Sequence, residues 1–394
     1  MFGISLDRHR VFNRRGIIVA GAAMLLGACS VIPKGAEPRP EPVAKPAPRP
    51  APGPTALPTD DSRHRVALLV PLSGTNGAVG QSIANATTMA LLDTNADNLR
   101  ITTYDTAKNA RDAARRAIAD GNKLILGPLM SDNISSVLAE ARPANVPLIS
   151  YSNDIAGAAN GVYLLGHVPG QSIARTIDYA RKKGASRFAA LIPAGDYGAR
   201  AEAAFRSSVE AEGGTLVAVE SYDRGNTSIM GAGQRLKSRG GYDAVLIADG
   251  ARLSIQAADT LRSNSTQLIG TELWSGESSL MRASALRGAL FSAVSDARFR
   301  RFTDSYRARF DTAPYRISTL GYDSVLLALR VASNGWKPGR VFPVKELQDE
   351  GGFLGLDGAF RFGSNGVAER VMEVREVRNG SVAIVDAAPT RFDD

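Results

Sequence analysis

The chain has 394 residues, of which 44% are apolar and 22% charged, a composition typical of a globular protein too long for one small core. Its formal net charge of +8 is mild, and no dense basic run alternates with aromatic residues, which argues against nucleic acid as a partner. The only cysteine is Cys29, so no disulfide can form within the chain.

Residues 1–28 are typical of a bacterial export signal. A cluster of arginines precedes an apolar run at 16–27, which is short of the ~20 residues that span a bilayer. Leu-Gly-Ala-Cys at 26–29 resembles the lipobox of bacterial lipoproteins, which implies cleavage before Cys29 and a covalent lipid on its thiol. In such lipoproteins a residue other than Asp after the cysteine accompanies sorting to the outer membrane, so Ser30 implies that destination. The alternative is an ordinary signal peptide followed by an incidental cysteine.

Residues 29–62 are expected to form a disordered tether. Ten of the 20 prolines lie between positions 33 and 58, and proline fixes φ and lacks the N–H that helices and sheets need. A spacer of this kind reaches ~100 Å when fully extended. Such a segment serves either to keep the domain off the membrane or to carry it into the cell-wall layer.

From residue 63 onward the pattern alternates strands and helices. Apolar strands are predicted at 65–72, 99–104, 123–127 and 146–150, and helices at 78–95, 107–120 and 131–141. After a short apolar segment at 162–165 the alternation repeats, with strands predicted at 188–192, 216–221, 243–248, 267–270 and 290–294, and helices at 171–183, 196–213, 229–238 and 253–262. Two helices at 297–310 and 317–334 and short β runs at 353–362, 370–377 and 382–385 follow. This order predicts an α/β protein with two doubly wound parallel-sheet lobes.

Six short motifs, in order, resemble type I periplasmic binding proteins of the Leu/Ile/Val-receptor class. They are VALLVPLSG at 66–74, GPLMS at 127–131, VPLISYSN at 146–153, Tyr-Gly at 197–198, GYDS at 321–324 and GLDGAFRFG at 355–363. With the lipobox and the tether, the chain most resembles the penicillin-binding-protein activator lipoproteins. That resemblance implies an outer-membrane-anchored regulator, facing the periplasm, that binds and activates a bifunctional peptidoglycan synthase, a class A penicillin-binding protein. The well-known activators carry a helical-repeat domain before the binding-protein body, and this chain has only the tether.

The resemblance to binding proteins also implies where the lobes begin and end. The chain is expected to cross between lobes near 167, 295 and 340. Lobe one would then comprise 63–167 and 296–339, and lobe two 168–295 and 340–394.

A ligand cleft is expected where the carboxyl ends of the strands of the two lobes face each other. Its candidate residues are Ser73, Ser131, Ser150 and Ser152 from lobe one, and Tyr197, with Glu272 or Trp274, from lobe two. In the amino-acid receptors, hydroxyls and backbone amides hold the ligand carboxylate, and an acid in lobe two meets its ammonium. The alternative is structural: Ser131 caps its helix, and the other serines occupy turns.

Nothing in the sequence predicts catalysis or a metal or cofactor other than the lipid on Cys29. The sequence contains no Gly-x-Ser-x-Gly nucleophile elbow, no His-Glu-x-x-His zinc helix and no Gly-x-x-x-x-Gly-Lys phosphate loop. His167 is interpreted as a hinge or packing residue. Two functions remain: the synthase regulator, or a solute receptor that takes an amino-acid-like or other small polar ligand and serves a transporter or sensor. An arginine-rich helix at 297–310 is a further candidate docking face, or simply a solvated surface.

Overall fold

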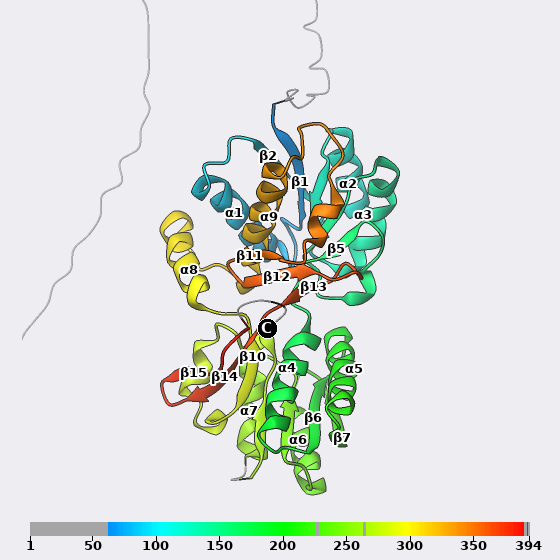
Figure 1. Cartoon of the computed structure of the whole chain (residues 1–394). Coiled ribbons are helices and arrows are strands. Elements are labelled where there is room, and N and C mark those ends of the chain that lie inside the picture. The colour runs from blue at the N-terminus through cyan, green and yellow to red at the C-terminus, as the bar shows by residue number, and fades with distance from the viewer. Residues whose placement is uncertain (1–61, 226–227, 263–264, 390–391, 393–394) are drawn as a thin grey trace, which may run out of the picture. The chain divides into compact units, whose positions relative to one another are not determined.

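The computed structural model of the protein describes residues 62–394 apart from 226–227, 263–264, 390–391 and 393–394 (Figure 1). The expected signal peptide, Cys29 and all but the last residue of the expected tether therefore lie outside the described residues. Within the described part, no helix is both long enough and apolar enough to cross a membrane.

A five-stranded parallel sheet in the order β2-β1-β3-β4-β5 forms the first lobe. Its strands are β1 (His64–Val70), β2 (Leu99–Asp105), β3 (Leu124–Leu126), β4 (Leu148–Ser150) and β5 (Val162–Leu164). The helices of this lobe are α1 (Gly77–Asp93), α2 (Ala110–Ala119), α3 (Ile134–Ala141), α8 (Ala297–Phe310) and α9 (Thr319–Ser333). Strand β1 is continuously apolar because both of its faces are covered: Leu68 packs in the cluster with α1 and α9, and Leu69 in the cluster with α2 and α3.

A seven-stranded sheet in the order β15-β14-β10-β9-β8-β6-β7 forms the second lobe. Its strands are β6 (Arg187–Pro193), β7 (Thr215–Tyr222), β8 (Ala244–Ile247), β9 (Gln267–Ile269), β10 (Leu290–Ala293), β14 (Glu373–Arg378) and β15 (Ser381–Asp386). Helices α4 (Pro169–Lys182) and α5 (Asp196–Ala211) cover one face, and α6 (Ser228–Arg239) and α7 (Ala251–Leu261) cover the other. Strands β6 to β10 pair in parallel, so the predicted fold class of two doubly wound lobes is confirmed.

A small antiparallel sheet corrects the expected boundary of lobe two. It consists of β11 (Phe353–Gly355), β12 (Gly358–Phe362) and β13 (Ala368–Arg370) and lies against the first lobe in Figure 1. Phe342, Phe353 and Phe360 are buried in the same core cluster as strand β1. Residues 340–370 therefore belong with lobe one, and the third crossover lies at 371–372 rather than near 340, because these aromatic side chains are buried against the first sheet.

Hydrogen bonds tie the crossover segments to one another. The amide of Gln171, in the first turn of α4, donates to the carbonyl of Ala368 at 2.8 Å and accepts from the backbone N–H of Arg370 at 3.1 Å. Arg370 in turn donates to the carbonyl of Leu165 at 2.7 Å, just after β5. At the crossover into α8, Arg298 donates to the carbonyl of Gly355 at 2.6 Å. Each crossover is thus anchored to the small sheet or its neighbouring strand.

Candidate functional site

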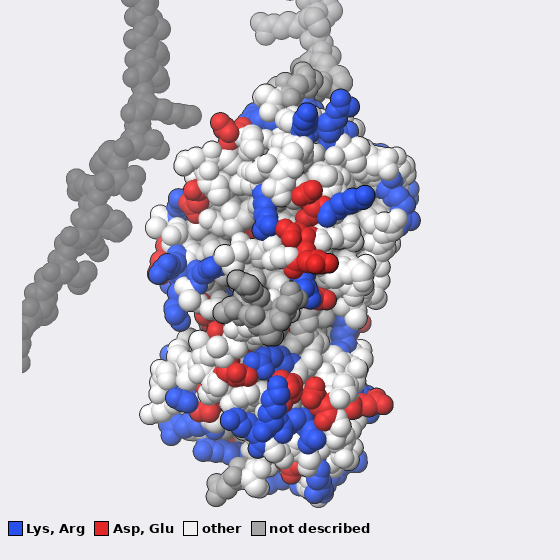
Figure 2. Space-filling view, viewed as in Figure 1, with Lys and Arg blue, Asp and Glu red and all other residues white. Residues whose placement is uncertain are grey.

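The expected ligand site lies where parallel strands end. In the first lobe, the loops after β1, β3 and β4 carry the four candidate serines; in the second, the segments after β6 and β9 carry Tyr197, Glu272 and Trp274. On the face shown in Figure 2, Lys and Arg are interspersed with Asp and Glu over both lobes, so the charge there is mixed. Recognition is therefore best sought in individual side chains and cavities.

Ser73 and Ser131 belong to the exposed part of the first-lobe edge. Ser73 donates to the Asp105 carboxylate at 3.4 Å and lines a cavity of 550 Å³ formed by the loops after β1, β2 and β3. Hydrogen bonds from the backbone N–H groups of Leu72 and Ala107 hold the pKa of Asp105 below its ordinary value. Ser131 begins the 3₁₀ helix η1 (Ser131–Asn133), and its hydroxyl donates to Asp132 at 3.4 Å.

Ser150 and Ser152 are buried, Ser150 as the last residue of β4 and Ser152 in the turn that follows. The Ser150 hydroxyl donates to the carbonyl of Pro128 at 2.9 Å and accepts from the N–H of Ser152 at 3.2 Å. Ser152 accepts from the N–H of Asp154 at 3.1 Å, and a hydroxyl that accepts a bond still has a proton to donate. Ser150 is therefore engaged in the turn, whereas Ser152 retains a donor for a ligand oxygen.

Tyr197 and Glu272 lie together at the edge of the second lobe. The Tyr197 hydroxyl donates to Oε1 of Glu272 at 3.1 Å and lies 3.0 Å from Oγ1 of Thr271. The other carboxylate oxygen of Glu272, Oε2, is buried and has no hydrogen-bond partner in the described part of the chain. Burial raises the pKa of Glu272 to about 7, with small opposing contributions from its own backbone and from Tyr197. One carboxylate oxygen of Glu272 is therefore hydrogen-bonded, and the other has no hydrogen-bond partner among the described residues.

Trp274 has a different position from its neighbour Glu272, although both belong to the 3₁₀ helix η4 (Glu272–Trp274). Its side chain is 1% exposed and packs on Phe291, with ring centroids 5.6 Å apart. The indole N–H donates to the carbonyl of Asp249 at 3.0 Å and to Ser254 at 3.1 Å. Its only donor is thus used within the lobe, and its ring belongs to the core of the second lobe rather than to the expected cleft.

The structure adds polar residues that the sequence analysis missed. Arg224 stacks over the ring of Tyr197, 5.3 Å from its centroid, and Nε of Arg224 lies 2.8 Å from the carboxylate of Asp249. Asp249 lies two residues after the end of strand β8, and this position near a strand end was a signal that could have identified it. No sequence signal places Arg224 beside Tyr197, because Tyr197 lies in the first turn of α5 and Arg224 in the loop after β7.

Arg200 joins the two edges. It extends from α5 of the second lobe to the turn after β4, where it lies 3.3 Å from the carboxylate of Asp154 and donates to the side-chain oxygen of Asn153 at 3.3 Å. These contacts link the loop that carries Ser152 to the helix that begins beside Tyr197. Among the described residues, no group of His, Cys, Asp and Glu is arranged to hold a metal ion.

Comparison with known proteins identifies the family. A family model described as "periplasmic binding protein" matches residues 64–381. The chain belongs to the periplasmic binding protein family. This assignment confirms the type I binding-protein fold and the expectation that the chain is a binding protein rather than an enzyme, and it indicates a place in the cell envelope.

Solved structures share the fold at low sequence identity. A putative branched-chain amino acid ABC transporter protein from Rhodospirillum rubrum is 19% identical, with 82% of this chain and 100% of that chain covered and a TM-score of 0.72. The branched-chain amino acid transporter substrate-binding protein LivJ of Streptococcus pneumoniae, solved with isoleucine, is 21% identical over 83% of this chain and 100% of that one, with a TM-score of 0.62. A solute-binding protein from Rhodopseudomonas palustris, solved with 3,4-dihydroxybenzoic acid, is 19% identical over 84% and 97%, with a TM-score of 0.65.

A curated relative is an uncharacterised protein of Rickettsia prowazekii. It is 31% identical over 134 residues, which is 34% of this chain. The match spans 36% of the length of that relative.

Proposed function

We propose that the chain is a solute-binding protein that takes an amino-acid-like ligand between its two lobes. The observation that carries this proposal is the Glu272 carboxylate, which is fixed by Tyr197 and has one buried oxygen without a partner among the residues that the structure describes. A buried acid with unused acceptor capacity is suited to a cationic group such as an ammonium. In the solved relatives, the bound molecules are isoleucine and 3,4-dihydroxybenzoic acid, which supports a small carboxylic acid as the class of ligand.

The ligand carboxylate would face the first lobe. The Ser152 hydroxyl has a proton to donate there, and Ser131 lies at the start of a short helix on the same edge. A ligand ammonium reaches Oε2 of Glu272 only after a local side-chain movement, because that oxygen has less than 1 Å² exposed. Closure of the lobes around such a ligand would be assisted by Arg200, which already bridges to Asp154.

The experiment is isothermal titration calorimetry of the purified protein with the twenty common L-amino acids and with 3,4-dihydroxybenzoate. We expect saturable binding of at least one amino acid, weakened by roughly tenfold or more in Glu272→Gln, since a charge-assisted contact is lost. Glu210→Gln is the matched control, because Glu210 is an exposed glutamate of α5 on the same lobe. Affinity should also increase as the pH rises through about 7, where Glu272 ionises, and this dependence should vanish in Glu272→Gln.

Binding that is equal in Glu272→Gln and wild type would contradict the assignment of the ammonium site. No binding of any of these compounds would contradict the amino-acid-like ligand class.

The comparisons favour this solute receptor over the synthase regulator, because the matched structures are described as transporter or solute-binding proteins. We retain as proposals the lipid on Cys29 and attachment to the outer membrane. Incorporation of labelled palmitate into the wild-type chain but not into Cys29→Ser would support the anchor; equal incorporation would contradict it. Enrichment of a class A penicillin-binding protein on the tagged, full-length protein, in place of a transporter or sensor, would revive the regulatory function.

A further inference from the structure

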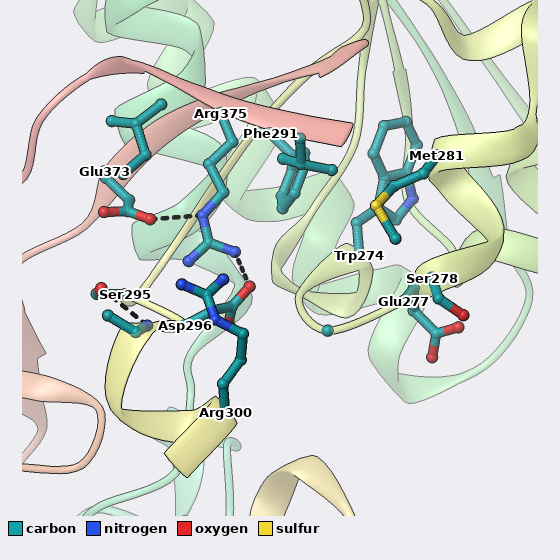
Figure 3. Close-up of a pocket in the computed structure, with 14 residues that line it drawn as sticks. Trp274, Glu277, Ser278, Met281, Phe291, Ser295, Asp296, Arg300, Glu373 and Arg375 are labelled. Carbon is teal, nitrogen blue, oxygen red and sulfur yellow. Dashed lines mark hydrogen bonds and ion pairs between the residues drawn. The ribbon is translucent and has the colours of Figure 1, made fainter. Parts of the chain in front are cut away.

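A second cavity lies in the second lobe beside the crossover into α8 (Figure 3). Its volume is 420 Å³, within the range of small-molecule sites. Its apolar surface comes from segments far apart in the sequence: Trp274, Met281, Phe291, Val382 and Ile384. The ring of Trp274 is fixed by its hydrogen bonds to Asp249 and Ser254, so this surface is preformed.

One wall of the cavity is a closed cluster of charges. Arg375 is almost completely buried and pairs with Glu373 at 2.7 Å and with Asp296 (Figure 3). A further guanidinium N–H of Arg375 donates to the carbonyl of Val294. The donors and acceptors of this cluster satisfy one another, so the cluster shapes the cavity and has little left to offer a ligand.

Two other charged side chains on the cavity, Arg300 and Glu277, are exposed. Neither the guanidinium of Arg300 nor the carboxylate of Glu277 forms a hydrogen bond or ion pair with any described residue. Figure 3 shows them on opposite sides: Arg300 extends from the first turn of α8, and Glu277 lies below Trp274 and Met281. The rim of the cavity thus carries one exposed cation and one exposed anion that have no partner among the described residues.

We propose that this cavity is a second ligand site, for a small α-amino acid with an apolar side chain. Arg300 would bind the carboxylate, Glu277 the ammonium, and the side chain would pack on Met281, Val382 and Ile384, the less buried apolar residues of the lining. A zwitterion matches the pair of opposite charges, whereas a simple acid or amine would leave one of them unpaired. The site is separate from the proposed site at Glu272, and neither assignment depends on the other.

The position of the cavity makes its occupancy measurable. The chain has two tryptophans, Trp274 in the cavity wall and Trp336 in the first lobe, where it packs against His64 and Phe342. In a Trp336→Phe variant, the remaining indole emission reports on Trp274 alone. Because Glu272 belongs to the same turn as Trp274, the measurement is made in a Glu272→Gln background, in which binding at the other site is expected to be weaker by roughly tenfold or more.

The experiment is a fluorescence titration of the full-length Trp336→Phe, Glu272→Gln protein with L-phenylalanine and L-leucine. We expect a saturable change in Trp274 emission with both, and binding weaker by about tenfold or more for phenylacetate and phenethylamine, which each lack one charged group. Arg300→Gln and Glu277→Gln should each weaken amino-acid binding by a similar factor. Arg301→Gln is the matched control, since Arg301 is the exposed neighbour of Arg300 on α8 and does not line the cavity.

Three results would overturn the proposal: no saturable response to either amino acid at millimolar concentration, a response unchanged by Arg300→Gln and Glu277→Gln, or equal binding of phenylacetate. Failure of the site at Glu272 would show up separately, as calorimetric binding to the otherwise wild-type chain that Glu272→Gln leaves unchanged. Circular dichroism of each variant checks that the fold is retained.

Discussion

Two buried carboxylates of this molecule, Asp357 and Glu272, have opposite surroundings. Asp357 lies in the turn between β11 and β12 and receives three bonds, from His167 at 2.8 Å, Arg316 at 2.6 Å and Thr319 at 2.8 Å. Burial alone would raise its pKa, but the charge of Arg316, followed by His167, outweighs burial and holds the pKa of Asp357 well below its ordinary value. Glu272 has no such cation, and its pKa is raised to about 7.

The role of His167 in this cluster follows from its own burial. Burial holds the pKa of His167 below its ordinary value even though Asp357 opposes that shift. At Asp357 the opposition to burial therefore comes first from the charge of Arg316 and next from His167. His167 thus joins the first crossover to the small sheet, consistent with its interpretation as a hinge residue.

This difference distinguishes a buried acid that stabilises the fold from a buried acid that is available to bind a ligand. A buried acid whose acceptors are filled contributes to the fold, whereas a buried acid with an unfilled acceptor costs stability and is retained where a ligand supplies the missing partner. Asp357 has three protein donors, and Glu272 has one side-chain donor and an orphan oxygen. Three substitutions test this distinction.

The largest effect is expected for Asp357→Asn. Loss of the charge leaves Arg316 and the buried Arg370 without their main counter-ion, so the unfolding free energy should fall by about 3–5 kcal/mol. Urea denaturation at pH 7 measures it. Asp259→Asn, at an exposed aspartate of α7, is the control and should change stability by less than about 0.5 kcal/mol. A cost of Asp357→Asn similar to that of the control would show that the cluster is not structural.

A smaller loss is expected for Gly355→Ala. A Cβ at this position would lie 2.3 Å from Oδ2 of Asp323, whose carboxylate accepts the backbone N–H of Leu356 at 2.6 Å. Relief of the clash must move this buried acid, so a loss of roughly 1–3 kcal/mol is expected in the same denaturation assay. Gly250→Ala is the control, because nothing lies within 4 Å of its Cβ position. Equal stability of the two variants would show that the turn before Asp357 tolerates displacement.

An effect of similar size to that of Gly355→Ala, but of opposite sign, is expected for Glu272→Gln. The pKa of Glu272 is about 7 in the folded protein and about 4.3 in the unfolded chain. Between these two pH values the folded state therefore retains a proton on Glu272 that the unfolded chain has lost. The wild type therefore loses stability relative to Glu272→Gln as the pH rises from about 4.3 to about 7. Without ligand, Glu272→Gln should be more stable at pH 8 by roughly 1–3 kcal/mol.

Unfolding curves of both proteins at pH 5 and pH 8, with Glu210→Gln alongside, give the comparison. If the difference in unfolding free energy between wild type and Glu272→Gln does not grow with pH, the pKa of Glu272 in the folded protein is not raised.

Much of the fold was predictable because parallel strands buried on both faces are recognisable as apolar runs. The run at 65–72 predicted β1, and the alternation with helices predicted both doubly wound sheets. The packing of the small sheet was not predictable, since the amphipathic pattern of 353–362 indicates that one face is buried but not which lobe covers it. Only the contact of Phe353 and Phe360 with the core of β1 decides that.

The candidate site was predictable only residue by residue. Strand ends identified Tyr197 and Glu272, which the structure brings into contact, but the same rule also selected Trp274, whose ring faces the lobe interior. A strand end fixes the edge of the sheet on which a residue lies, and the following turn decides where its side chain points. The charges of Arg200 and Arg224 reach the site from a helix and a distant loop, which no local pattern encodes.

The bonds of Gln171 and Arg370 restrict how the two lobes can move. Three separate polypeptide crossovers would permit twisting, sliding and bending between the lobes in any combination. Here Gln171 holds Ala368 and Arg370, and Arg370 holds Leu165, so the first and third crossovers are joined side by side. Because these two crossover segments are bonded to each other, the lobe motion that disturbs their hydrogen bonds least is a rotation about the line that joins them. A ligand between the lobes would therefore be enclosed along a fixed path.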